Sequence, residues 1–203
     1  MDEMTGIQAL ERLHPTLPMR PGLIERREFE YIRHGTLSLI AGFDIGTGRI
    51  AASSMAPTRG ETDFARYVKQ LLETDPQGEW ILIADRLNTH QSESLVRLVA
   101  DCCELDESLG QKGISGVLKS QASRAAFLAD PRHRIRFVYT PKHCSWLNQI
   151  EIWFSILVRR LLKRSSFKST LDLQKQICQF IDYFNETMAK PFKWTHRGKP
   201  LYA

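Results

Sequence analysis

The chain has 203 residues, which is the length of one domain, and its 42% hydrophobic and 25% charged residues are ordinary for a globular protein. No apolar stretch approaches the roughly 20 residues that span a bilayer. The first residues have neither the basic nor the apolar part of a secretory signal. These features exclude a membrane-spanning protein and predict a cytoplasmic one that contacts no membrane.

Charge is distributed unevenly along the chain. Residues 1–111 carry 11 Lys and Arg against 18 Asp and Glu, a net charge of −7, whereas residues 112–203 carry 17 against 5, a net charge of +12. Such asymmetry is typical of a protein whose basic half meets a polyanion, so nucleic acid is a candidate partner. The alternative is a solvated basic surface that has no partner.

The first third of the chain predicts strands and turns. A short strand is expected at residues 7–10, followed by a proline-rich connection through residue 21. Two further strands are expected at 35–44 and 49–55, and the glycines of the segment 46–48 predict a tight turn between them.

The middle of the chain alternates helix and strand. A helix is predicted over 61–73, because Phe64, Val68, Leu71 and Leu72 recur on one helical face. The continuous apolar run at 80–84 predicts a strand buried on both faces, as in the centre of a parallel sheet. A second helix is expected from about 92 to 102.

The last third predicts a basic helical stretch over roughly 115–128, a strand over 134–139 and two long helices over 146–163 and 170–187. Ser169 or Thr170 is expected to cap the last helix. The order of elements predicts an α/β fold with one mixed sheet and helices on its faces.

Two acidic residues occupy positions that suit chemistry. Asp85 follows the apolar strand, and ligands of open α/β sheets bind beyond the carboxyl ends of strands. Glu151 lies at the edge of an apolar helical stripe, about 100° from Ile150 on the helical wheel. The stripe is formed by Trp146, Ile150, Trp153, Phe154, Leu157 and Leu161. The plain alternatives are a turn-capping Asp and an ordinary boundary Glu. Together the two carboxylates suggest a hard cation such as Mg²⁺.

Several segments resemble a known family. The segment HCSWLNQIEIWF at 143–154 is similar to the signature around the third catalytic carboxylate of bacterial insertion-sequence transposases of the mariner-like superfamily. The segment DRLNTH at 85–90 resembles the motif of their second carboxylate, and DEMTGIQAL at 2–10 resembles the stretch that opens with the first. The segment 190–195 also resembles the end of the family's chains.

The resemblance implies a ribonuclease H-like fold and a catalytic, metal-binding triad of Asp2, Asp85 and Glu151. It also implies Mg²⁺ or Mn²⁺ as cofactor, with two ions, and double-stranded DNA as partner, both as transposon ends and as target. The implied reaction is strand cleavage followed by strand transfer, and the implied assembly includes a homodimer.

The chain departs from the family pattern in three ways. Arg86 stands where the family usually has Asn. Glu151 is 66 residues after Asp85, against a spacing in the mid-thirties, which predicts an insertion near 103–130. The sequence as given starts just before Asp2, which predicts an N-terminally truncated catalytic domain over 1–203 that lacks its first strand and its helix-turn-helix region. Asp2 is then expected to hang from a loose chain end.

The basic residues expected to contact DNA lie in or after the predicted insertion. They are Lys112, Lys119, Arg124, Lys142, Arg159, Arg160, Lys163 and Arg164.

Three functions compete at this point. The first is a transposase catalytic domain that cleaves and joins DNA. The second is an inactive, truncated transposase fragment that binds DNA or a full-length partner. The third is a stand-alone ribonuclease H-like nuclease.

Overall fold

The structure is a computed structural model that describes residues 1–106, 108–141 and 144–193. Strands β1 (Asp2–Arg12), β2 (Tyr31–Phe43) and β3 (Ile50–Ala56) form an antiparallel sheet in the order β1-β2-β3. Strands β4 (Trp80–Ala84) and β5 (Ile135–Tyr139) form a separate parallel pair. The α/β class is confirmed, but the single mixed sheet is not formed within the described residues.

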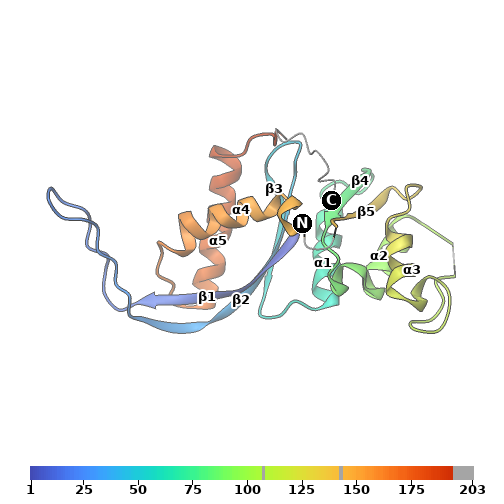
Figure 1. The fold of residues 1–203 in the computed structure, drawn as a ribbon, viewed down its shortest axis with the longest axis horizontal. Coiled ribbons are helices and arrows are strands. Elements are labelled where there is room, and N and C mark those ends of the chain that lie inside the picture. Colours follow the sequence, from blue (N-terminus) through green and yellow to red (C-terminus); the bar gives the residue numbers. More distant parts are fainter. Residues whose placement is uncertain (107, 142–143, 194–203) are drawn as a thin grey trace, which may run out of the picture.

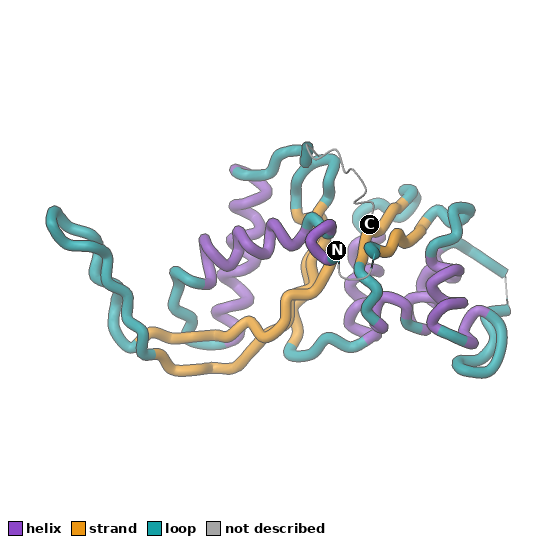
Figure 2. Tube along the Cα trace, in the orientation of Figure 1, coloured by secondary structure: helices purple, strands orange, loops and turns teal. Residues whose placement is uncertain are grey.

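In the part of the chain that the structure describes, five α-helices surround these strands (Figures 1 and 2). They are α1 (Glu61–Leu72), α2 (Glu93–Cys102), α3 (Gln121–Leu128), α4 (Ile150–Leu157) and α5 (Thr170–Thr187). The 3-10 turns η1 (Asn88–Gln91), η2 (Val117–Lys119) and η3 (Ser145–Leu147) and the π-helical segment η4 (Val158–Leu162) complete the order. The predicted helices over 61–73, 92–102 and 170–187 are confirmed to within one residue, and the Ser169 side chain caps α5.

The core consists of two apolar clusters that meet on strand β2. Leu37, Leu39 and Ala41 belong to the cluster formed with α4 and α5, whereas Ile40 belongs to the cluster formed with α1, α2, β4 and β5. This alternation follows from the two-residue period of a strand whose two faces are both covered by helices. The first half of β2, up to Thr36, is exposed.

Strand β1 is longer than the sequence predicts, because it begins at Asp2 rather than at residue 7. Gly6 has a φ of +67°, and the register with β2 shifts between Met4 and Ile7. This irregularity is a β-bulge, which interrupts the alternation of side chains by which strands are identified in sequences. The expectation that Asp2 hangs from a loose end is wrong, since Asp2 is paired with Ala41 and buried.

The predicted hairpin between β2 and β3 is confirmed. Its turn is closed by the carboxylate of Asp44, which accepts hydrogen bonds from the Gly46 N–H at 2.8 Å and from the Thr47 hydroxyl at 2.5 Å. Gly48 has a φ of +76°, and a Cβ there would lie 1.8 Å from the carbonyl oxygen of Lys190. Glycine is therefore required at this position for both its conformation and its lack of a side chain.

Strand β4 is parallel to β5, as expected, but it is not buried on both faces. Leu82 and Ala84 are buried, whereas Ile81 is 56% exposed. Helices cover only one face of the pair at this point, so the apolar run is an incomplete guide to burial. Within the described residues β4 pairs with no strand except β5.

The predicted long helix over 146–163 is divided into η3, α4 and η4. Ile150, Trp153, Phe154 and Leu157 form the buried stripe as expected. Trp146 does not belong to it, because it precedes α4 and is 64% exposed. The helical wheel fails at Trp146 because the chain is not α-helical there.

The predicted insertion near 103–130 contains η2 and α3 and packs into the domain. Leu118, Phe127 and Leu128 are buried in the same cluster as β4 and β5. The expected helix over 115–128 is confirmed only from Gln121 onward, with η2 before it.

An arm projects from the body where β1 and β2 continue into residues 13–30 (Figure 1). Isolated bridges join Leu17 to Arg26 and Arg20 to Leu23 along it. The arm carries several of the most exposed apolar side chains, among them Met19, Ile24 and Phe29.

Candidate active site

Asp2 is the first residue of β1 and is only 7% exposed. Its Oδ1 accepts the N–H of Glu3 at 2.8 Å, and its Oδ2 accepts the side-chain amide of Asn148 at 3.2 Å. The pKa of Asp2 is raised to about 6, chiefly by burial and also by the nearby charges of Asp85 and Glu3, against the Glu3 N–H and His90, which lower it. Asp2 is therefore a buried carboxyl group beside other carboxylates, whose negative charges disfavour its ionised form.

Asp85 lies directly after β4, as predicted, with its side chain 34% exposed. Its Oδ1 lies 2.7 Å from Nδ1 of His90 and accepts the N–H of Leu87 at 2.9 Å. The hydrogen bond from His90 holds the pKa of Asp85 below its usual range. Among the described residues no hydrogen bond is made to Oδ2 of Asp85, so that oxygen is left for a ligand.

Glu3 and His90 form a buried pair between β1 and η1. Nε2 of His90 lies 3.0 Å from Oε2 of Glu3, and the two side chains are 0% and 1% exposed. The other oxygen of Glu3, Oε1, is buried and makes no hydrogen bond within the described part of the chain. Burial alone would lower the pKa of His90, but its hydrogen bonds to Asp85 and Glu3 raise it to about 9.

The protonation of His90 decides which groups could bind a metal. Ligand atoms of Asp2, Glu3 and His90 lie within 4.8 Å of one another, which is close enough for a shared ion. However, both ring nitrogens of His90 face carboxylates, and an imidazolium has no lone pair to offer a cation. The metal-binding capacity of this cluster therefore rests on its carboxylates.

Glu151 lies in the first turn of α4 and is exposed. Its N–H donates to the carbonyl of Asn148 at 3.1 Å, and the side chain of Asn148 contacts Asp2. Glu151 also lines a surface hollow together with Glu3, Met4 and Thr5 from β1. The structure thus brings Glu151 to the strand that carries Asp2, one helical turn from the residue that touches it.

The basic residues expected to contact DNA fall into two groups. Lys112 and Arg124 are engaged within the protein, because Lys112 lies 3.5 Å from Glu61 and Arg124 donates to the carbonyl of Gln91 at 2.7 Å. A second group is exposed and follows α4 directly: Arg159, Arg160, Lys163 and Arg164. Lys119 is exposed in η2, and Lys142 lies outside the described residues.

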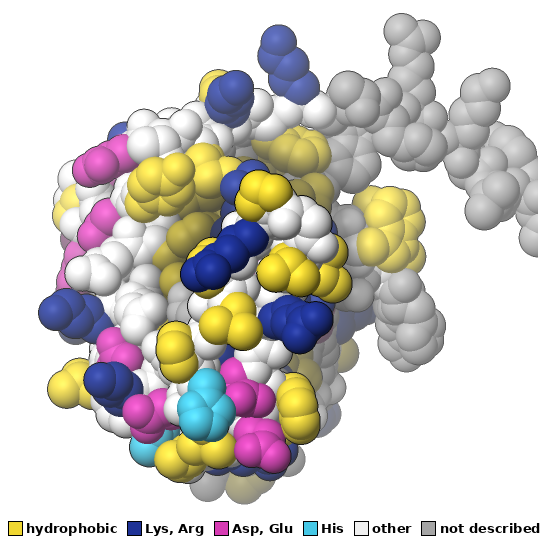
Figure 3. Space-filling view, turned by 90° about the vertical axis from the view of Figure 1, so that its left-hand side faces the viewer, with side chains coloured by type: hydrophobic (Ala, Val, Ile, Leu, Met, Phe, Trp, Pro, Cys, Tyr) yellow, Lys and Arg dark blue, Asp and Glu magenta, His cyan; other side chains and the backbone are white. Residues whose placement is uncertain are grey.

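Two of the exposed cations border the acidic site. Arg159 and Lys163 line the same hollow as Glu3 and Glu151. Seen from the side of the arm, Lys and Arg side chains are interspersed with apolar ones rather than gathered in one uniform patch (Figure 3). The hollow therefore joins a negative end at the carboxylates to a positive end on η4.

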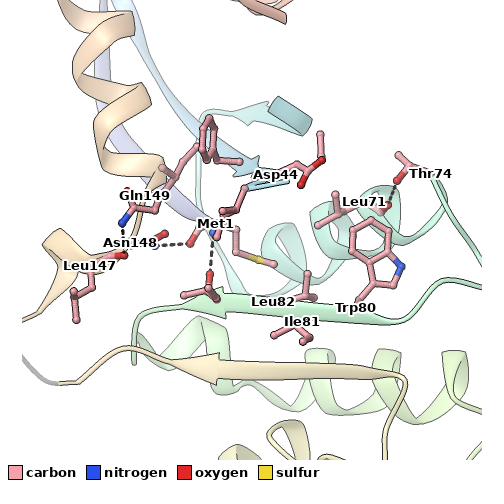
Figure 4. A pocket seen from close by; sticks show the side chains of 16 residues that line it. Met1, Asp44, Leu71, Thr74, Trp80, Ile81, Leu82, Leu147, Asn148 and Gln149 are labelled. Atoms are coloured by element: carbon pink, nitrogen blue, oxygen red, sulfur yellow. Dashed lines mark hydrogen bonds between the residues drawn. The ribbon is translucent and has the colours of Figure 1, made fainter. Parts of the chain in front are cut away.

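A cavity of about 360 Å³ lies beside the site, between the two sheets. It is lined by residues 42–45 of the first sheet and its turn, residues 80–83 of β4, and Met1. The amino group of Met1 points to β4 and donates to the carbonyl of Ile83 at 2.8 Å (Figure 4). Its lining includes none of Asp2, Asp85 and Glu151, and it is mainly apolar, so it is not the place of the chemistry.

Sequence reasoning named the three carboxylates but assigned no role to Glu3, His90 or Asn148. All three lie inside the motifs that carried the resemblance. A signal was available for His90, because a histidine five residues after a strand-terminal Asp can reach back to it across one turn. No local signal pairs Glu3 with His90 or Asn148 with Asp2, since these contacts join positions 87 and 146 residues apart.

The donor set fits a hard divalent cation. Asp2 and Glu3 crowd negative charge into a buried place, and Oε1 of Glu3 has no partner among the described residues. A cation at such a place would offset that charge, and oxygen donors are those that Mg²⁺ and Mn²⁺ take.

Buried carboxylates at the meeting point of an antiparallel sheet, a parallel pair and a helix start define an α/β domain of the nuclease type. Residues 1–174 match the family described as DDE superfamily endonuclease. The chain therefore belongs to this family, whose members act on DNA with divalent metals.

We found no matching protein among the curated ones and no matching solved structure. Within the part of the chain that the structure describes, no helix has both the length and the apolar character that crossing a bilayer requires.

Proposed function

We propose that this domain cleaves DNA strands and transfers the cut ends to target DNA, as the catalytic domain of an insertion-sequence transposase. The observation that carries the proposal is the gathering of carboxylates from β1 and from the end of β4 around His90. Ligand atoms of Asp2, Glu3 and His90 lie within 4.8 Å of one another, and Oδ1 of Asp85 lies 2.7 Å from Nδ1 of His90. Membership of the DDE superfamily endonuclease family supports a nucleic-acid substrate.

In this proposal Asp2, Asp85 and Glu151 hold two Mg²⁺ or Mn²⁺ ions. When bound, such ions stabilise the attacking and leaving oxygens of a phosphoryl displacement. Asp2 and Asp85 would present oxygens from rigid strand ends, and Glu151 would approach from α4, whose start is tied to β1 through Asn148. The order of three antiparallel strands followed by parallel ones is compatible with a ribonuclease H-like arrangement.

The DNA backbone would follow the hollow from the carboxylates to η4. Arg159, Arg160, Lys163 and Arg164 are exposed there, and phosphate contacts of this kind position a duplex without reading its sequence. A π-helical segment such as η4 is often found at a functional site. A homodimer holding two transposon ends is the assembly we propose for strand transfer, with function inside the cell.

The inactive-fragment alternative depends on a poorly held Asp2. In the structure Asp2 is buried, paired with Ala41 and hydrogen-bonded by Asn148, and this supports an active catalytic domain over an inactive fragment. A residue held from three sides can keep the position that catalysis needs.

The test is a cleavage and strand-transfer assay on DNA carrying the transposon ends, with Mg²⁺ or Mn²⁺. We expect Asp2→Asn, Asp85→Asn and Glu151→Gln each to lower the cleavage rate by at least about 100-fold, since each removes a charged oxygen ligand. Glu186→Gln, an exposed carboxylate on α5, is the matched control and should retain the full rate.

Three outcomes are distinguishable. Equal, small losses for all four variants would contradict the triad. Cleavage without strand transfer would favour the stand-alone nuclease. A wild-type chain that binds DNA and a divalent ion but cuts nothing would establish the inactive fragment.

A further inference from the structure

We propose that Glu3 and His90 form a buried brace that positions the carboxylate of Asp85 for metal binding, so that both are positioning residues of the site. The inference rests on the proposed function, because it assigns Asp85 as a ligand. It goes beyond that function by giving two residues outside the carboxylate triad a defined task.

The brace consists of one imidazolium between two carboxylates. Nδ1 of His90 lies 2.7 Å from Oδ1 of Asp85, and Nε2 lies 3.0 Å from Oε2 of Glu3. Each ring nitrogen therefore has its own carboxylate, and the ring cannot rotate or flip without breaking both contacts. Charge-assisted hydrogen bonds of this kind are roughly twice as strong as neutral ones.

His90 is itself fixed by its surroundings. Its ring lies 4.2 Å from the ring of Phe64, centre to centre, and is 0% exposed. Its carbonyl accepts the hydroxyl of Tyr139 at 2.9 Å, and its N–H donates to Leu87 at 3.0 Å. The histidine is thus held by α1, by β5 and by its own turn, and it transmits that rigidity to Asp85.

These contacts fix the orientation of the Asp85 carboxylate. With Oδ1 occupied by His90 and by the Leu87 N–H, the plane of the carboxylate is set, and Oδ2 is the oxygen that remains for a cation. When a residue that hydrogen-bonds to a metal ligand and orients it is mutated, metal affinity commonly falls 10- to 100-fold. Glu3 acts one step further back, because it holds the far side of the ring.

A purely electrostatic role predicts the opposite result, which makes the proposal testable. His90 carries a positive charge close to the carboxylates, so removing it should strengthen cation binding if charge alone mattered. If His90 positions Asp85, its removal should weaken cation binding, because the ligand is then free to rotate.

The experiment measures Mn²⁺ binding to the protein without DNA, from the electron paramagnetic resonance signal of free Mn²⁺. We expect His90→Gln to raise the dissociation constant about 10-fold, since Gln can serve only one of the two carboxylates. His34→Gln is the matched control, because His34 also pairs with a carboxylate, Glu11 at 2.7 Å, but lies in the exposed first half of β2. It should bind Mn²⁺ as the wild type does.

A second pair of variants addresses the case in which His90→Gln does not fold. Glu3→Gln removes the charge of Glu3 but keeps an oxygen for Nε2 of His90, whereas Glu3→Ala removes both. If the brace acts by position, Glu3→Ala should bind Mn²⁺ at least about threefold more weakly than Glu3→Gln. If only the charge of Glu3 matters, the two variants should bind equally.

The outcomes separate this inference from the proposed function. Unchanged or tighter Mn²⁺ binding by His90→Gln, or equal binding by the two Glu3 variants, would overturn the brace even though Asp85→Asn weakens binding. A wild-type protein whose Mn²⁺ binding does not respond to Asp85→Asn would overturn both the metal site and the brace.

Discussion

The side-chain amide of Asn148 donates to Oδ2 of Asp2 at 3.2 Å and to the carbonyl of Met1 at 2.8 Å. Asn148 is buried and lies two residues before Ile150, the first residue of α4, so this one amide ties the helix that carries Glu151 to the strand that carries Asp2. Residues 146 positions apart are thereby held in one arrangement. In the proposed metal site Asp2 and Glu151 hold the same ions, and this link would set the distance between them, which neither element fixes alone.

Asn148→Ala should therefore damage both stability and activity. It leaves Oδ2 of Asp2 and the Met1 carbonyl without this donor, and losing a buried partner costs about 1–3 kcal/mol of unfolding free energy. Urea denaturation measures this loss, and the DNA cleavage assay should show at least a 10-fold lower rate, of the size that misplacement of a catalytic group produces. Gln176→Ala, which removes a half-buried amide from α5, is the control and should change neither greatly.

The sequence predicted the elements with strong periodicity well and the links between them poorly. Helices α1, α2 and α5 have clear apolar patterns and were predicted to within one residue. The β2–β3 hairpin was predicted from its turn signal, although β2 begins four residues earlier than expected. Strand β1 was underestimated, because the bulge at Gly6 breaks its alternation. Trp146 was misassigned, because a helical wheel assumes a continuous helix where the chain has a 3-10 turn.

In the site, too, single residues could be predicted from the sequence, but the contacts between distant segments could not. Their positions made Asp85 and Glu151 candidates, with a turn-capping Asp and a boundary Glu as the alternatives, and the family resemblance named them as metal ligands together with Asp2. The contacts of Glu3 with His90 and of Asn148 with Asp2 depend on how β1, η1 and α4 pack, and no local pattern encodes that packing. The burial of Asp2 likewise could not be anticipated from a position so close to the chain end.

Stability should depend on pH through His90. Its pKa is raised to about 9 in the folded chain against an ordinary 6.5, so its contribution is fully present below pH 6.5 and is lost as the pH rises through about 9. The amine of Met1 acts oppositely: burial lowers its pKa from 8.0 to about 6, which makes stability rise between these values. The measurement is therefore the difference in unfolding free energy between the wild type and His90→Gln.

That difference should be largest at pH 6 and should shrink by a few kcal/mol toward pH 10, since each unit of pKa shift corresponds to about 1.4 kcal/mol. Denaturation curves at five pH values between these limits suffice. A constant difference across the range would mean that His90 is not charged in the folded protein.

DNA binding should be mainly electrostatic and should depend on the cations that follow α4. Reversing Arg159, Arg160 and Lys163 to Glu is expected to weaken binding to all DNA sequences alike, because phosphate contacts carry no sequence information. Fluorescence anisotropy should also show a shallower loss of affinity between about 50 and 200 mM salt, since fewer counterions are released. Lys69→Glu, an exposed change on α1, is the control. Wild-type binding that is insensitive to salt would contradict the proposed DNA path.

The apolar cavity between the sheets predicts a stabilising change. Within the described residues β4 has only β5 as a ladder partner, and the amino group of Met1 already makes the bond to Ile83 that a strand N–H would make. A designed variant with four apolar, β-branched residues before Met1 should extend β1 into the cavity of about 360 Å³, between residues 42–45 and β4. It would join the two sheets and move the amine out of its buried position.

We expect the unfolding free energy of this variant to rise by about 2–4 kcal/mol, from two or three ladder hydrogen bonds and the burial of apolar side chains. An extension of equal length made of Gly and Ser offers the same backbone without the apolar side chains and should gain much less. Urea denaturation of the three proteins decides the matter, and equal midpoints for both extensions would show that the cavity does not accept a strand.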